Sequence, residues 1–113
     1  MKRRALAALS AYYLASGAWP ILHIGSFEAV TGPKTDRWLV NTVGALAIAN
    51  GAALAFGLRR EQISTETTLL AVCSAIAFTA IDVVYVTRGR IRPVYLGDAA
   101  VELALAAAIV ADD

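Results

Sequence analysis

The chain has 113 residues, of which 58% are hydrophobic and only 17% are charged. A water-soluble domain ordinarily carries about 25% charged residues and gives its helices polar outer faces, so a soluble helical bundle is disfavoured. The formal net charge of +1 gives no reason to expect a nucleic-acid partner, and a single cysteine excludes an internal disulfide.

Four apolar stretches follow one another along the chain. The first covers residues 5–24 and contains Pro20 near its end, where the ring kinks or ends a helix. The other three cover residues 38–58, 67–87 and 94–111. A helix needs about 20 apolar residues to cross the hydrocarbon core of a bilayer, with a range of about 17 to 25. The sequence therefore predicts an all-α fold, with four transmembrane helices in one domain over residues 1–113.

Short polar connections separate these stretches. Residues 25–37 form the longest one, and its Thr31-Gly32-Pro33 sequence predicts a turn. Residues 59–66 end in a candidate N-cap, Ser64, for the third helix, and residues 87–93 lead into the fourth. Because short connections force neighbouring helices to run antiparallel, we expect an up-down-up-down bundle.

The basic residues do not decide the orientation in the membrane. One side would carry Lys34, Arg37, Arg88, Arg90 and Arg92, and the other Lys2, Arg3, Arg4, Arg59 and Arg60. This balance permits a dual-topology, antiparallel homodimer. The first helix usually dominates the orientation, so we expect both termini in the cytoplasm.

Polar side chains within the predicted spans converge on the half of the bundle near the first and third connections. On the first span, helical spacing places Trp19 and His23 on one face. On the fourth, Asp98 and Glu102 are one turn apart. We expect one pocket to be lined by Trp19, His23, Asn41, Asp82, Tyr85, Tyr95, Asp98 and Glu102.

The acidic residues carry most of this hypothesis. Glu102 lies near the middle of its span, where a charged side chain costs about 2.5 to 3.5 kcal/mol on insertion scales. Glu102 should therefore face the interior of the bundle, protonated, hydrogen-bonded or paired. Arg88, Arg90 and Arg92 are the nearest cations, and we expect them to bind lipid head groups or act as counter-ions.

Several of these residues also have a purely structural interpretation. His23 could be satisfied by a carbonyl or water at the membrane interface, and Asn41 could simply join two helices. Trp19 would suit an interfacial aromatic belt. The three acids Asp82, Asp98 and Glu102 are harder to explain in this way, since ionisable groups inside a membrane are rare and generally functional.

The segment WLVNTVGALAIANGAALAFGLRRE, residues 38–61, resembles the second helix of small four-helix bacterial membrane proteins of the DoxX-like kind. In those proteins a glycine-bearing second span also ends in arginine. Their first span closes on a glycine motif similar to Ser16-Gly17-Ala18-Trp19. The resemblance implies a four-helix fold in the bacterial inner membrane, and it transfers no catalytic residue.

Three functions are compatible with this pattern. The first is binding: an acid-lined pocket open to one leaflet would hold a small amphiphilic or lipid-derived ligand, or the chain would be an accessory subunit of a larger membrane complex. The second is a small oligomeric ion- or proton-coupled transporter or channel, suggested by Glu102. The third is a membrane enzyme that uses His23 and the carboxylates on a lipid-soluble substrate.

Binding ranks first because the fourth span is apolar beyond Glu102 and offers no continuous polar route across the membrane. The lipid bilayer is the expected partner, together with a small amphiphile and a second copy of the chain or a larger complex. We expect no cofactor. The acids lack the paired spacing of known metal motifs, so we expect no metal and assign no catalytic residue.

Overall fold

The computed structural model describes residues 1–111, and every regular element in that range is an α-helix, which confirms the all-α prediction. The helices are α1 (Lys2–Leu22), α2 (Ile24–Thr31), α3 (Arg37–Gly57), α4 (Thr65–Thr87) and α5 (Tyr95–Ala111). Three of them, α1, α3 and α4, are long and apolar enough to cross a membrane. Helix α5 has 17 residues. Residues 112 and 113 of the predicted domain lie outside the described residues.

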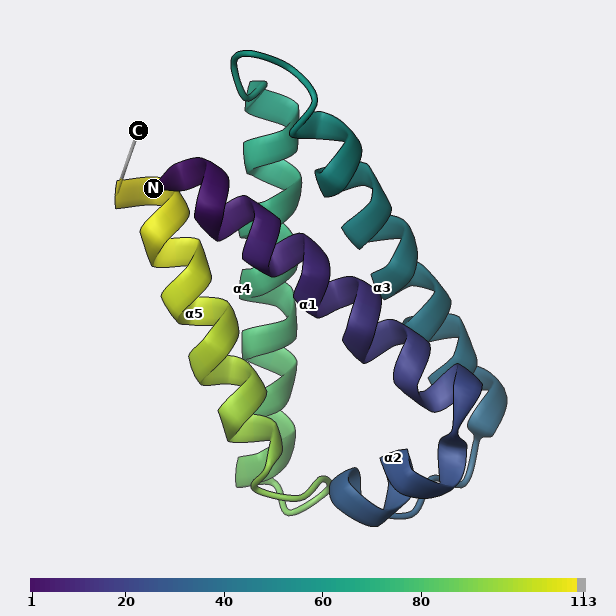
Figure 1. Ribbon diagram of the computed structural model, residues 1–113. Helices are drawn as coiled ribbons and strands as arrows, with labels where there is room; N and C mark the ends of the chain where they lie inside the picture. Colours follow the sequence, from purple (N-terminus) through teal and green to yellow (C-terminus); the bar gives the residue numbers. More distant parts are fainter. Residues whose placement is uncertain (112–113) are drawn as a thin grey trace.

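The four long helices alternate in direction along the chain (Figure 1). Helix α1 runs obliquely between α5 and α3 and contacts both, while α4 packs against α5 and touches α3. Helix α2 lies at the lower end, where the paths of α1 and α5 diverge. As a result, one end of the molecule is closed by direct helix packing, and α2 borders the other.

Helix α2 differs from the prediction of an irregular connection over residues 25–37. The backbone breaks at His23, where φ is −152° and ψ is 79°, and the imidazole Nδ1 then accepts the Ser26 N–H at 3.1 Å as the N-cap of α2. Gly32 ends the helix with φ at 103°, a conformation that favours glycine. Histidine is not among the usual N-cap residues, so this start signal was not recognised.

Glycines bring α1 and α3 into close contact. A Cβ added at Gly44 would lie 2.6 Å from the carbonyl oxygen of Gly17, so only the absence of side chains allows this approach. Two turns further along α3, the Gly51 carbonyl accepts a hydrogen bond from the Ser10 hydroxyl of α1 at 2.7 Å. Small residues and buried hydroxyls of this kind are what hold helices together where water does not drive association.

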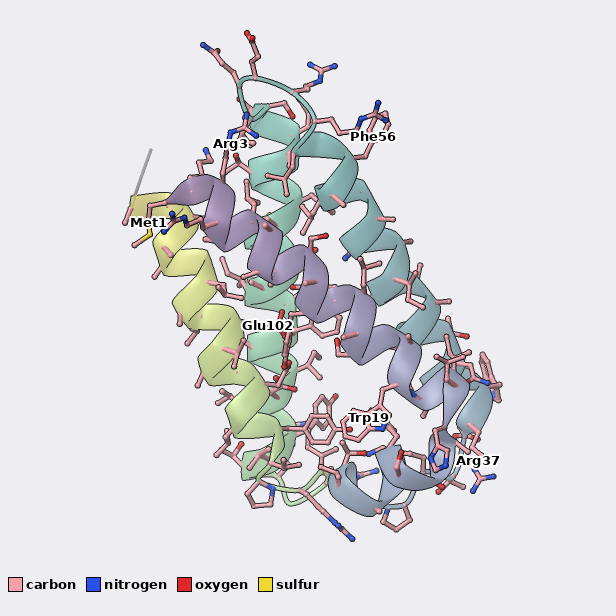
Figure 2. The ribbon with its side chains drawn as sticks, viewed as in Figure 1. Met1, Arg3, Trp19, Arg37, Phe56 and Glu102 are labelled. Carbon is pink, nitrogen blue, oxygen red and sulfur yellow. The ribbon has the colours of Figure 1, made fainter. Side chains whose placement is uncertain are left out.

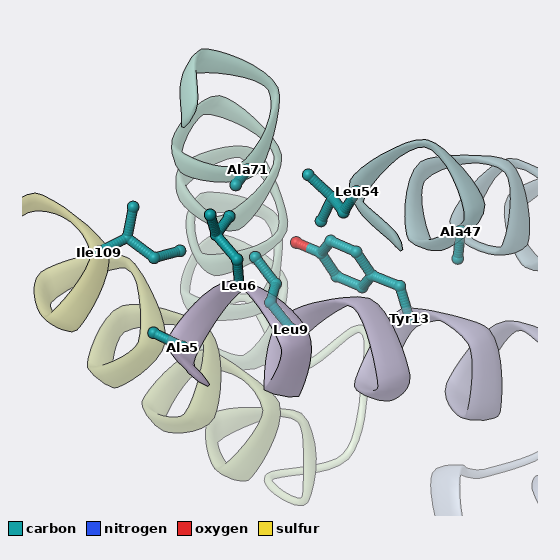
Figure 3. Packing of buried hydrophobic residues seen from close by; sticks show 8 residues of the cluster. All are labelled: Ala5, Leu6, Leu9, Tyr13, Ala47, Leu54, Ala71 and Ile109. Carbon is teal, nitrogen blue, oxygen red and sulfur yellow. The ribbon is translucent and has the colours of Figure 1, made fainter. Parts of the chain in front are cut away.

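The buried hydrophobic cluster occupies the end of the molecule where α1 begins, α3 ends, α4 begins and α5 ends (Figure 3). We call this the packed end. Its side chains are Ala5, Leu6, Leu9, Leu54, Ala71 and Ile109, while Tyr13 and Ala47 extend the same cluster to the middle of α1 and α3. Arg3 closes this end by donating to the carbonyls of Leu58, Arg60 and Glu61 in the connection between α3 and α4. Ser64 caps α4, as predicted, through its hydroxyl and the Thr67 N–H.

Candidate functional site: an acid cluster in an interhelical cavity

Three carboxyl groups from two adjacent helices meet in the middle of the molecule, and we call them the acid cluster. Asp82 comes from α4, and Asp98 and Glu102 come from successive turns of α5. Each offers a carboxylate oxygen within 4.8 Å of those of the other two. Asp82 is 4% exposed and Glu102 only 1%. Figure 2 shows Glu102 on the inner side of α5, facing the other helices.

Two tyrosines of α1 donate hydrogen bonds to this cluster. The Tyr12 hydroxyl donates to Asp98, and the Tyr13 hydroxyl donates to Oε1 of Glu102. The Tyr13 ring packs against Phe78 of α4, with centroids 5.5 Å apart, and this contact holds it in place. Because α1 lies obliquely across α5, two consecutive residues of α1 can both reach acids on α5.

Asp82 differs from its two neighbours in that neither tyrosine of α1 donates to it. Its Oδ2 is buried and makes no hydrogen bond, and the Thr79 hydroxyl one turn earlier on α4 is also buried without a partner. Among residues 1–111, no salt bridge reaches any member of the acid cluster. Buried polar groups are ordinarily satisfied, so an orphan carboxylate oxygen calls for an explanation.

The acid cluster opens onto a cavity of about 650 Å³ that borders all five helices. The size falls within the range of about 300 to 1,000 Å³ that is typical of small-molecule sites. Apart from the acids and their tyrosines, its walls are mainly apolar. They include Pro20, Val30, Val40, Val43, Phe78 and Val101.

The end of the cavity nearest α2 is lined by aromatic rings and one lysine. Trp19 donates its indole N–H to the Ser26 hydroxyl at 2.9 Å, and its ring meets Phe27 edge to face at 5.3 Å. Figure 2 shows Trp19 between α1 and α2. The Lys34 ammonium lies 5.0 Å from the centre of the Tyr95 ring. These contacts tie α2 to α1 and to the start of α5.

Glu28 fastens α2 to the segment that follows it. Its carboxylate accepts the Lys34 backbone N–H at 2.8 Å and pairs with the Arg37 guanidinium, also at 2.8 Å. The Lys34 N–H, with the Arg37 side chain as a further contributor, lowers the pKa of Glu28 below its usual value. The carboxylate therefore stays ionised, and the two hydrogen bonds fix how α2 lies relative to α3.

The structure brings five of the eight predicted pocket residues to the cavity and places three outside it. Those that line it are Trp19, Asp82, Tyr95, Asp98 and Glu102. His23 is exposed and caps α2 instead. Asn41 is exposed because α3 turns Val40 and Gly44 toward the cavity, and that rotation leaves Asn41 on the outer face. These two residues and Tyr85 do not line the cavity.

The three predicted head-group arginines do not line the cavity and, within residues 1–111, make no ion pair with the acid cluster. Arg88 lies over Tyr85, with its guanidinium carbon 5.8 Å from the ring centre, and Tyr85 does not line the cavity. Arg92 donates to the Ala29 carbonyl at 3.2 Å. Arg90 is exposed. None of the three neutralises a buried acid, so they are not counter-ions of the cluster.

Sequence reasoning missed three residues that shape the site: Tyr13, Phe27 and Lys34. Tyr13 was overlooked because adjacent residues project about 100° apart around a helix, so it was not expected to reach the same pocket as Tyr12. The signal that could have found it is the tyrosine pair itself, since two adjacent hydroxyls inside an apolar span both need partners. Phe27 and Lys34 belong to α2 and its exit, which were expected to form a loop.

Comparison of the chain with protein-family models, with curated proteins and with solved structures gives no match. Function is therefore inferred from the geometry of the site. Three carboxyl oxygens this close together can share protons, coordinate a hard metal ion, or accept hydrogen bonds from one positively charged group. The apolar walls add a surface on which an alkyl chain or ring could lie.

Proposed function

We propose that this chain is a small integral membrane protein that binds an amphiphilic or lipid-derived ligand in the cavity beside the acid cluster. In this proposal α1, α3, α4 and α5 form a four-helix up-down-up-down bundle in the bacterial inner membrane, with both termini in the cytoplasm. Helix α2 would lie at the opposite interface, and the cavity would open to that leaflet. The lipid bilayer is the immediate partner.

The outer surface of the helices supports the membrane assignment. Large apolar side chains are exposed along all four long helices, among them Ile21 at 44%, Leu46 at 61%, Leu69 at 60%, Ile76 at 55% and Leu103 at 52%. Soluble proteins rarely expose apolar surface so continuously. The longest dimension of 43 Å equals the thickness of a bilayer with its head groups, about 40 to 45 Å. The DoxX-like resemblance of residues 38–61 points the same way.

One observation carries the binding proposal: a mainly apolar cavity of about 650 Å³ has buried acids at its inner end. An amphiphile matches this division, with its chain along the walls and its polar group at the acids. Val43 and Val101 line the cavity and are 50% and 40% exposed. The cavity thus reaches the apolar outer surface, from which a ligand dissolved in the bilayer could enter.

The same geometry favours binding over the two alternatives. A transporter needs a route past the acid cluster, but Leu6, Leu9 and Ile109 beyond it are fully buried and tightly packed. An enzyme of the type considered above needs a histidine near the substrate, and His23 lies outside the cavity. A role as an accessory subunit or homo-oligomer is compatible with binding and would use the exposed outer faces.

Trp19 lines the cavity and can report occupancy, because bromine quenches tryptophan fluorescence on close contact. The protein would carry Trp38→Phe, so that Trp19 is the sole tryptophan, and would be reconstituted in phosphatidylcholine nanodiscs with 11-bromoundecanol. We expect saturable quenching. A Trp19→Phe protein, which keeps only the 67% exposed Trp38, measures quenching from the surrounding bilayer.

Ser16→Phe fills the cavity, and Ala15→Phe adds the same ring on the exposed side of α1. We expect Ser16→Phe to abolish the saturable component and Ala15→Phe to keep it. Quenching that rises linearly and equally for Trp19 and Trp38, or that is indifferent to Ser16→Phe, would reject the proposed function.

A further inference from the structure

We propose that the acid cluster is a site for a positively charged nitrogen, so that the ligand of the cavity is an amphiphile bearing an amine. This inference rests on the proposed binding function and names the chemical class of the ligand. The acid cluster has fewer hydrogen-bond donors than acceptors. Two tyrosine hydroxyls serve three carboxyl groups, and Oδ2 of Asp82 has no donor.

Asp82 is the member of the acid cluster with a buried oxygen that lacks a hydrogen-bond partner. Asp82 lines the cavity and is only 4% exposed, and its buried Oδ2 has no hydrogen-bond partner within residues 1–111. Tyr12 and Tyr13 are already committed to the two acids of α5. Apart from a proton shared between the acids, a further donor for Asp82 can come from a group that enters through the cavity, where Asp82, Asp98 and Glu102 converge.

The spacing of the three acids suits an ammonium group. A tetrahedral nitrogen with N–H···O bonds of about 2.9 Å places its three acceptors about 4.7 Å apart. One carboxylate oxygen from each acid lies within 4.8 Å of those of the other two, so the three are no farther apart than a single ammonium group can span. A hydroxyl head group would supply one donor and no charge, whereas an ammonium supplies three donors and the counter-charge that buried carboxylates need.

In the part of the chain that the structure describes, residues 1–111, no basic side chain pairs with the acid cluster. Lys34 is the basic residue that lines the cavity, but its ammonium lies over the rings of Phe27 and Tyr95 and donates to the Thr31 carbonyl at 3.2 Å. Arg37 is paired with Glu28. Anionic amphiphiles are disfavoured by the three acids, and the apolar walls that begin beside the cluster give an alkyl substituent of the amine somewhere to pack.

The test compares two matched probes, 11-bromoundecylamine and 11-bromoundecanol, by quenching of Trp19 in the Trp38→Phe protein in neutral phosphatidylcholine nanodiscs. We expect the amine to bind about tenfold more tightly than the alcohol, the size of effect that a charge-assisted hydrogen bond produces. In Asp82→Asn, which keeps the shape of the side chain, the two affinities should come within about twofold. Glu61→Gln, in the exposed connection before α4, should keep the full preference.

The outcomes separate this inference from the proposed function. Saturable binding of both probes with equal affinity, or an amine preference that survives in Asp82→Asn, would overturn the amine assignment and leave amphiphile binding intact. Absence of saturable binding by either probe would overturn both. Mn²⁺ alone is the remaining probe: stoichiometric Mn²⁺ binding that is lost in Asp82→Asn, together with no amine preference, would assign the cluster to a metal ion instead.

Discussion

The two ends of this helical assembly use the same four long helices to opposite effect. At the packed end, Leu6, Leu9, Leu54 and Ile109 are completely buried and the helices touch directly. At the other end, which we call the open end, the same helices and α2 surround a cavity of about 650 Å³. We expect the packed end to contribute most of the free energy of unfolding. The open end can then keep buried acids and a cavity because the packed end holds the helices together.

The sharpest test of this contrast shortens one apolar side chain at each end. Leu54→Ala leaves a void in close-packed surroundings and should lower the free energy of unfolding by about 2 to 5 kcal/mol. Val43→Ala borders the existing cavity and is half exposed, so its cost should stay below about 1 kcal/mol. Steric trapping in bicelles would measure both. Equal losses would contradict the division into two ends.

A second test concerns the contact that joins α1 to α3 between the two ends. Gly44→Ala forces a Cβ against the Gly17 carbonyl and should cost about 1 to 3 kcal/mol of unfolding free energy. Gly97→Ala is the matched control, because its new Cβ meets no atom within 4 Å. It should be neutral or stabilising by up to about 1 kcal/mol. A neutral Gly44→Ala would show that the helices do not need this close approach.

At the open end, the hydrogen bond from the Tyr13 hydroxyl to Glu102 should contribute to the free energy of unfolding. Tyr13→Phe removes the hydroxyl that bonds Glu102 and leaves a buried carboxyl group short of a donor, at a cost of about 1 to 2 kcal/mol. Tyr85→Phe, outside the cavity, should change the same unfolding free energy by less than about 0.5 kcal/mol. Should both variants unfold alike, the acid cluster would not depend on α1.

The smallest expected effect is the pH dependence contributed by Glu28. Its folded pKa is lowered, chiefly by the Lys34 N–H, so its stabilisation is fully present above the usual glutamate pKa of about 4.3 and is lost as the pH falls through the folded value. The wild type should therefore be more stable than Glu28→Gln at pH 6, and the two should converge at low pH. Thermal unfolding between pH 3 and 7 would show whether this difference narrows.

The sequence was sufficient to locate the long helices, because apolar stretches bounded by charges and turns leave little choice. The predicted 38–58 and 67–87 stretches differ from α3 and α4 by at most two residues at either end. Helix α2 was missed because it is short, contains Gly25 and starts on a histidine cap. The histidine cap can be recognised as a helix start only when the packing of α2 against Trp19 of α1 is known.

For the site, the cost of burying acids predicted which residues turn inward, and Asp82, Asp98 and Glu102 do meet. Helical spacing alone could not give the tilt of α1 or the rotation of α3. Those two angles decide that Tyr13 reaches Glu102 and that Asn41 does not reach the cavity. Tilt and rotation are set by close contacts such as Gly17 with Gly44, which involve residues far apart in the sequence.

The most direct measurement is a crystal structure grown in a lipid mesophase with 11-bromoundecylamine and phased on the anomalous signal of bromine. We expect a bromine peak between the apolar walls near Val43 and Val101, with the amine nitrogen among the oxygens of Asp82, Asp98 and Glu102. Bromine found solely on the outer faces of the helices, or the three acids separated and turned toward head groups, would contradict the account.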